Sequence, residues 1–249
     1  MRLDSFSACF VQQDTKRRDM LGSCICSVVH CTVVTVLTYE ELCGRDWTLL
    51  GFYSGSNGAK FDLGSPNSAT GTAAIIYCTG FMLADQIFMY IWCPWEKLFI
   101  LHHWATLLYM GAVLWLGTGD LSCCLCICLG EVTNPINNTM AISDLLHSEG
   151  LLPPAINRLS AAALCVAFVF IRVLYAPFGV CYVICHYYLV SGAGGHVNLA
   201  VRLLWCILPV AVTYVSIDYL RNLVNDVIQD TVNSVARKAR DEVTNKKQV

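Results

Sequence analysis

Six apolar windows, each about 20 residues long, constrain this chain more than any other feature. They fall at about 21–39, 72–93, 98–117, 121–141, 159–190 and 199–220. A helix of that length crosses a bilayer with all of its backbone hydrogen bonds satisfied. Only 14% of the 249 residues are charged, whereas soluble domains average about 25%. We therefore predict an all-α, multi-pass transmembrane helix bundle with six spans.

The distribution of lysine and arginine predicts how this bundle is oriented. With six spans, both termini share one side of the membrane with the loops near 94–97 and 142–158. Twelve lysines and arginines fall on that side and three on the other. Positively charged loops stay in the cytosol, so we expect both termini to be cytosolic. The segment from 40 to 70 is rich in Gly, Ser and Asn and is expected to form an exposed loop.

Apolar residues beyond the last window predict that its helix leaves the membrane as an amphipathic stretch. This stretch either packs on the cytosolic face of the bundle, which we favour, or binds anionic headgroups through its basic end. The residues at helical spacing are Leu220, Leu223, Val227, Ile228, Thr231 and Val235. The expected parts of the chain are a cytosolic N-terminal segment (1–19), a membrane domain (20–225) and a cytosolic helical tail (226–249).

The fifteen cysteines do not predict a disulfide framework. Cys123, Cys124, Cys126 and Cys128, for example, lie in one apolar window with no turn residues between them. Free cysteine behaves as a small buried apolar residue, and no pair has the spacing of a zinc ribbon. We therefore expect free, buried thiols and no metal site.

A few polar residues interrupt the apolar windows and predict a site between the helices. His102 and His103 open the third window, and Glu131 lies in the fourth. Such residues are costly in a bilayer, so they should face the interior of the bundle. From the helical rise, His102 lies about 6 Å inside its span, with Asn138 at a similar depth and Glu131 near the membrane centre.

The same depth calculation places Asp85, His30 and Arg172 near the centre of their own spans. We expect an ion pair of Arg172 with Glu131 or Asp85, because unpaired charges are costly there. Buried ion pairs often have a structural role, which is the interpretation we favour for Arg172 and Asp85. His30 is interpreted as a core histidine.

The histidine pair and the Asn134-Pro135 step predict a pocket for a ligand. Neighbouring helix positions point about 100° apart, so one histidine can address a ligand while the other contacts the second or fourth span. Thr106, one turn on, can share the ligand's face. Histidine can accept a proton near neutral pH or carry a transient acyl group. Proline frees a backbone carbonyl one turn earlier, near Glu131, and a kink there makes room for a lipid headgroup or acyl carbonyl.

Four features together resemble the TLC-domain family: "GFMLADQIF", "LHHWATL", "GEVTNPINN" and Arg172 in the fifth span. This family includes the ceramide synthases, the translocation-associated membrane proteins and several lipid-homeostasis proteins. The resemblance covers about 20–225 and is closest to the TLC domain-containing protein 4 type. It implies a bundle of six or seven helices in the endoplasmic reticulum that acts on lipids.

The resemblance also implies candidate roles for individual residues. In ceramide synthases the histidine pair is catalytic, which makes His102 and His103 the candidate catalytic residues. The candidate ligand-binding or supporting residues are Asp85, Thr106, Glu131, Asn134, Asn138 and Arg172. Ceramide synthases carry a His-Asp-x-x-Asp element in the next helix, where this chain has "EVTNP" from 131 to 135. That departure argues against N-acylation of sphingoid bases.

Two functions follow from these observations. The first is a lipid-homeostasis protein that binds lipid or acyl chains in a polar pocket within the membrane and influences membrane lipid composition. The alternative is an acyltransferase related to the ceramide synthases, with acyl-CoA as co-substrate, so enzymatic activity stays open. We expect membrane lipids as partners, no nucleic acid and no other cofactor, and the sequence leaves a homo-oligomer open.

The sequence excludes two other classes of membrane protein. A di-iron desaturase needs about eight clustered histidines, and this chain has six. A channel would line one span with a continuous polar stripe, which is absent from the sequence.

Overall fold

The computed structural model describes residues 3–45, 62–148, 150–191, 195 and 197–246. This part of the chain is almost entirely helical, with one isolated bridge between Pro66 and Thr118 and no strand. Its elements are α1 (Leu3–Gly44), α3 (Ala69–Trp92), α4 (Lys97–Leu116), α5 (Asp120–Glu131), α6 (Asn134–Ser148), α7 (Pro154–Phe168), the π-helix η1 (Val169–Cys181), α8 (Tyr182–Cys185), the π-helix η2 (His186–Val190) and α9 (Leu199–Lys246).

Within the described residues, five helical segments are long and apolar enough to cross a membrane. They are Asp19–Gly44, Ala69–Trp92, Lys97–Leu116, Pro154–Val190 and Leu199–Gln229. Five of the six predicted windows therefore correspond to a candidate span. The fourth, at 121–141, does not form one continuous helix. It contains α5 and α6, which are roughly 18 and 22 Å long at the usual rise per residue, less than the roughly 30 Å of a bilayer core.

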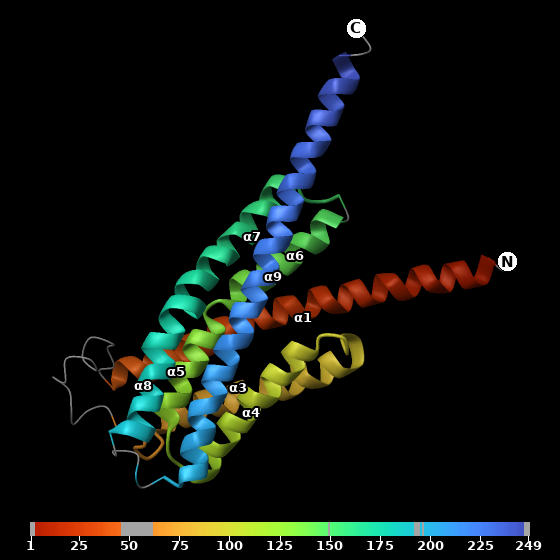
Figure 1. The fold of residues 1–249 in the computed structure, drawn as a ribbon. Helices are drawn as coiled ribbons and strands as arrows, with labels where there is room; N and C mark the ends of the chain where they lie inside the picture. Colours follow the sequence, from red (N-terminus) through yellow and green to blue (C-terminus); the bar gives the residue numbers. More distant parts are fainter. Residues whose placement is uncertain (1–2, 46–61, 149, 192–194, 196, 247–249) are drawn as a thin grey trace.

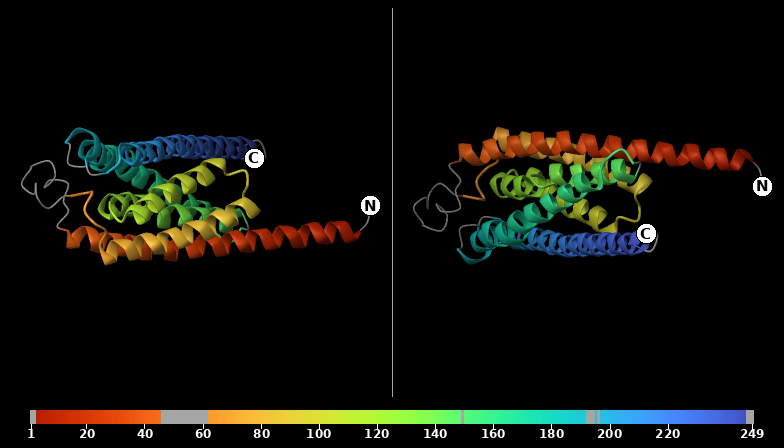
Figure 2. Two further views of the ribbon diagram at one scale, coloured as in Figure 1. Left: turned by 90° about the horizontal axis from the view of Figure 1, so that it is seen from below. Right: turned by 90° about the horizontal axis from the view of Figure 1, so that it is seen from above.

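The interrupted segment lies at the centre of the bundle. Helix α5 contacts α1, α3, α4 and η1, while α1 also packs along α6 and α3. Helix α9 packs against α4, α7 and η1 on the opposite flank. Both termini project away from the end of the bundle that holds the start of α3 and the start of α9 (Figures 1 and 2). Helix α5, the first half of the interrupted segment, is thus surrounded by longer helices, while Val132 in the break itself is exposed.

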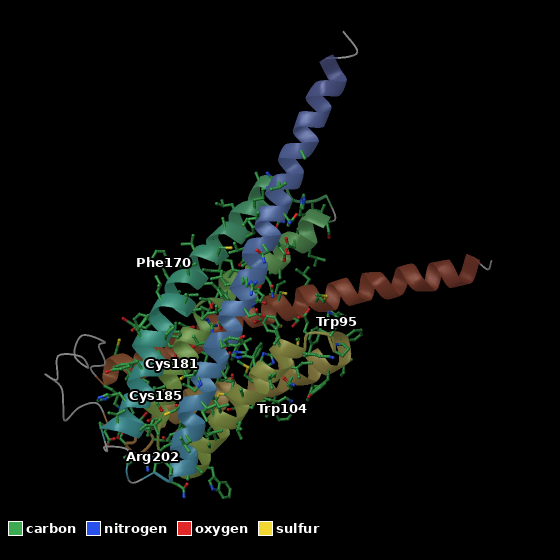
Figure 3. All side chains as sticks on the ribbon, viewed as in Figure 1. Trp95, Trp104, Phe170, Cys181, Cys185 and Arg202 are labelled. Carbon is green, nitrogen blue, oxygen red and sulfur yellow. The ribbon has the colours of Figure 1, made fainter. Side chains whose placement is uncertain are left out.

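The outer surface of the bundle is apolar, as expected for a protein that faces lipid. Trp95, Trp104 and Phe170, labelled in Figure 3, are among many large apolar side chains that are more than half or about half exposed. Soluble monomers rarely expose apolar surface on this scale. Buried polar side chains such as His30, Glu131 and Arg172 lie inside instead. This distribution identifies an integral membrane protein.

A polar cluster joins three helix ends on the side away from the termini. Asp120, at the start of α5, is fully buried and accepts hydrogen bonds from the Ser68 backbone N–H (2.6 Å) and from Arg45 Nη2 (3.5 Å). Arg45 Nε also donates to Glu41 Oε1 at 2.9 Å. The Ser68 hydroxyl caps the first turn of α3 by accepting from the Gly71 N–H. These bonds fix α1, α3 and α5 relative to one another.

The expected loop at 40–70 is shorter at both ends than predicted, because α1 continues to Gly44 and α3 begins at Ala69. Residues 46–61 lie outside the described part.

The cysteines whose side chains are described are all free. Those on α5 are small enough to let this central helix approach its neighbours closely, and Cys123 and Cys124 are completely buried. The expectation of unpaired thiols is therefore met on this helix, whereas the expected burial holds for Cys123 and Cys124 and only in part for Cys126 and Cys128.

Candidate functional site

A cavity of about 70 Å³ lies between α4, α5, η1 and α9. This volume has room for a few water molecules or for a short part of a lipid, such as a carbonyl group, but not for a whole lipid. The polar side chains His102, Glu131 and Arg172 reach the cavity from three different elements. Apolar residues supply most of the remaining wall, among them Ala105, Met110, Ile127, Leu208, Pro209 and Val212. An apolar wall with a few convergent polar groups is typical of a ligand-binding site.

The two histidines point in different directions, as the 100° step between neighbours predicts. His102 lines the cavity. His103 is buried against α3, with its Nε2 atom 3.6 Å from Asp85 Oδ2. The ring centroids are 5.9 Å apart and the ring planes differ by 47°. His102 is therefore the histidine that can contact a ligand, while the His103–Asp85 contact holds the start of α4 against α3.

Glu131 ends α5 and is held in place by two donors. The Cys31 thiol and the Asn134 amide each donate to its Oε2 atom at 2.8 Å. The predicted neighbourhood of Glu131 and Asn134 is thus observed, and Asn134 orients the carboxylate rather than lining the cavity. Cys31 was not predicted, because nothing in its sequence context distinguishes it from the other cysteines of the chain.

Arg172 makes contacts different from those we expected. Its Nε atom donates to Thr133 Oγ1 at 3.1 Å, and its Nη2 atom donates to the Gly130 carbonyl. Its guanidinium carbon also lies 5.6 Å from the centre of the Phe168 ring. Neither predicted carboxylate forms a salt bridge with it, so the prediction of a direct ion pair with Glu131 or Asp85 is wrong. A cation at the last carbonyls of a helix is favourable, because the helix dipole is negative there.

The break between α5 and α6 explains why Arg172 binds the backbone. The helical pattern stops at Val132 and Thr133, two residues before Pro135. Proline has no N–H to donate to a carbonyl one turn earlier, so it disfavours a continuous helix through this point. Carbonyls at the end of α5 then need other donors, and Arg172 supplies one to Gly130. The kink predicted from Asn134-Pro135 is therefore an interruption that the π-helix η1 stabilises from outside.

Asn138 and Thr106, which were also predicted to belong to the site, form their hydrogen bonds within the protein. Asn138 Nδ2 donates to Ser27 Oγ and to the Asn134 carbonyl, both at 2.9 Å, so it joins α6 to α1 and does not line the cavity. Thr106 does line the cavity, but its hydroxyl donates to the His102 carbonyl at 2.9 Å. The polar groups offered to a ligand are therefore those of His102, Glu131 and Arg172.

Fold and site together define a class: an integral membrane bundle of helices with a partly polar cavity around an interrupted helix. Residues 21–222 match the model of the TLC domain family. The chain belongs to the TLC domain family. Comparison with curated proteins and with solved structures gave no match.

Proposed function

We propose that this protein binds membrane lipids or their acyl chains at the cavity between α4, α5, η1 and α9, with a short part of the lipid such as its carbonyl group inside the cavity, and thereby influences membrane lipid composition. One observation carries the proposal: His102, Glu131 and Arg172 converge on a cavity whose remaining lining is mostly apolar. An apolar wall favours acyl chains, while a guanidinium and an imidazole can donate hydrogen bonds to an ester carbonyl or phosphate. The TLC domain fits a role connected with membrane lipids.

Lipid that co-purifies with the full chain provides the test. Wild-type protein, His102→Leu and Glu131→Gln would be purified in the same detergent, and their bound lipids extracted and quantified. We expect each cavity variant to retain about tenfold less lipid, equivalent to losing about 1.4 kcal/mol of binding free energy. His147→Leu is the matched control, because His147 contacts the Leu152 carbonyl at the end of α6, outside the cavity. Equal lipid content in all four proteins would contradict the proposal.

The alternative, an acyl-CoA-dependent acyltransferase, is favoured by the position of His102. Its ring reaches the cavity while His103 and Asp85 hold the neighbouring backbone. His102 would accept the proton of an acceptor hydroxyl or amine as that group attacks the thioester carbon, and the CoA thiol would leave. Membranes given labelled acyl-CoA should then form a labelled lipid that is absent with His102→Ala. No labelled product across sphingoid and glycerol acceptors would exclude this alternative.

The membrane topology we propose has six spans, with α5 and α6 together forming the fourth. Termini on one side of a membrane require an even number of crossings, and the two ends of this chain project from the same end of the bundle (Figures 1 and 2). From the lysine and arginine distribution we propose that this end faces the cytosol, together with residues 1–19 and the helical tail 226–249. We further propose residence in the endoplasmic reticulum and membership of the TLC domain-containing protein 4 type.

A glycosylation-site scan would test this topology. An acceptor sequence inserted in the segment between α1 and α3 should be glycosylated, because that segment would face the lumen. The same sequence added after residue 249 should stay unmodified. Modification of the C-terminal acceptor would contradict the proposed orientation.

A further inference from the structure

A second group of polar side chains meets where α1, α3 and α5 pack together. His30, Cys78 and Glu131 come one from each helix, and all three are buried. A ring nitrogen of His30, the sulfur of Cys78 and a carboxylate oxygen of Glu131 all lie within 4.8 Å of one another. Nitrogen, sulfur and oxygen donors are thus brought together from distant parts of the chain.

His30 is the unusual member of this group. Its side chain is only 2% exposed, yet neither ring nitrogen has a hydrogen-bond partner. Buried polar atoms without a partner are rare because they lose their bonds to water on folding. The ring is stacked on Phe81, with centroids 3.7 Å apart and planes 5° apart, and also on Tyr77 at 5.2 Å. These aromatic contacts hold the imidazole in one orientation beside Cys78 and Glu131.

We propose that His30, Cys78 and Glu131 bind a zinc ion. Zinc is bound in proteins by cysteine sulfur, histidine nitrogen and carboxylate oxygen, with bond lengths of about 2.0–2.3 Å. Tetrahedral bonds of that length place neighbouring ligand atoms roughly 3.3–3.6 Å apart. Donor atoms within 4.8 Å therefore need to approach one another by roughly 1 Å, a shift that side-chain torsions can supply.

Charge and hydrogen bonding favour this ligand set. On binding, the Cys78 thiol loses its proton to solvent, and the thiolate and the Glu131 carboxylate together neutralise the two charges of Zn²⁺. A neutral group is far less costly to bury than an isolated carboxylate. The Cys31 and Asn134 side chains already orient the carboxylate through its Oε2 atom, as the outer partners of metal ligands commonly do.

The cysteine spacing predicted no metal site, because spacing reveals only ligands that lie close together in the sequence. Here each helix contributes one ligand. A zinc ion at this point would tie α1 and α3 to the end of α5, and it would fix the Glu131 carboxylate beside the cavity. Glu131 belongs to both sites, but His30 and Cys78 do not line the cavity, so variants of these two residues test zinc binding separately from lipid binding.

The test uses the full chain, purified in detergent without chelators or metal-affinity resin. Elemental mass spectrometry should find close to one zinc per chain. After the zinc is removed, adding Co²⁺ should produce an absorption spectrum with a thiolate-to-cobalt charge-transfer band. Cys78→Ser should lose that band. His30→Ala should bind metal at least about tenfold more weakly, since even the loss of an outer partner costs 10- to 100-fold.

Two matched controls separate a ligand from any buried residue of the same kind. Cys206→Ser removes another buried cysteine, on α9, and His147→Ala removes a histidine outside the cluster. Both should keep wild-type zinc content. The proposal is overturned if wild-type protein neither carries zinc nor gives the charge-transfer band with Co²⁺, a result that needs no variant to fold. It is also overturned if folded Cys78→Ser keeps the band.

Discussion

Replacing Arg172 with leucine tests whether the guanidinium stabilises the break between α5 and α6. The change removes two hydrogen bonds, to Thr133 Oγ1 and to the Gly130 carbonyl. Bonds to charged groups contribute about 1.5–3 kcal/mol each. The Gly130 carbonyl would keep only a long hydrogen bond from the Thr133 hydroxyl, at 3.5 Å, so part of the roughly 1–3 kcal/mol cost of an unsatisfied buried carbonyl is added. Leucine recovers part of this by burying its own apolar surface. We expect a net loss of about 3 kcal/mol, within the range for disrupting a buried charged network.

The assay is thermal unfolding in detergent, followed by the fraction that still elutes as folded protein. At roughly 2–4 °C per kcal/mol for a chain of this size, the midpoint should fall by roughly 6–12 °C. Arg172→Lys should lie between wild type and leucine, because lysine keeps the charge but not the two-point contact. Arg158→Leu, an exposed position on α7, is the matched control and should change little.

A double-mutant cycle makes this prediction specific to the contact. Thr133→Val removes the hydroxyl that accepts from Arg172 Nε. The losses from Thr133→Val and Arg172→Leu should add up to more than the loss of the double variant, by about 0.5–3 kcal/mol. Strict additivity, or a leucine variant as stable as wild type, would refute the assignment of Arg172 as the group that satisfies the end of α5.

The glycines before α5 and the exposure of the thiols give two more predictions. Gly119→Ala should cost about 2–5 kcal/mol, because Gly119 has a φ of 93° and an added Cβ would meet the Trp205 ring at 2.8 Å. Gly117→Ala separates backbone strain from the clash with Trp205, because Gly117 has a φ of 65° and open space around it. We expect this variant to lose only about 1–2 kcal/mol of unfolding free energy, from backbone strain. Equal losses for the two variants in denaturant titrations would contradict the Trp205 contact. Maleimide should label Cys43, which is exposed at the end of α1, in folded protein and label Cys123, which is 1% exposed, only after denaturation. Equal labelling rates would mean that α5 is not at the centre of the bundle.

The positions of the spans could be predicted from the sequence because hydropathy determines them directly. Ala69–Trp92 and Lys97–Leu116 begin and end within three residues of the predicted windows. The window at 121–141 is the exception, since its apolar residues continue on both sides of the break. Pro135 was the available signal, and it correctly indicated a distortion one turn upstream. That the helix is interrupted there depends on contacts from η1, which local sequence does not contain.

The contents of the site were only partly predictable because depth along a helix says nothing about rotation around it. Asn138 was placed with the histidines by depth, but its side chain faces Ser27 on α1. Rotation is set by packing against neighbouring helices. The partner of Arg172 was missed for a related reason: a backbone carbonyl freed by the helix break competes with carboxylates, and sequence patterns do not reveal it. The cluster around His30 needed three helices in contact before it could be recognised.

Mapping where a photoactivatable lipid attaches tests the central claim, that the cavity binds lipid. Purified protein would be incubated with a phospholipid that carries a photoreactive group on its acyl chain next to the ester carbonyl, the part of the lipid that fits the cavity. It would then be irradiated, digested and sequenced by mass spectrometry. We predict adducts on cavity-facing residues of α4 and α5, suppressed by unlabelled lipid and by His102→Leu. Adducts confined to exposed apolar residues such as Trp104, unaffected by either treatment, would contradict the account.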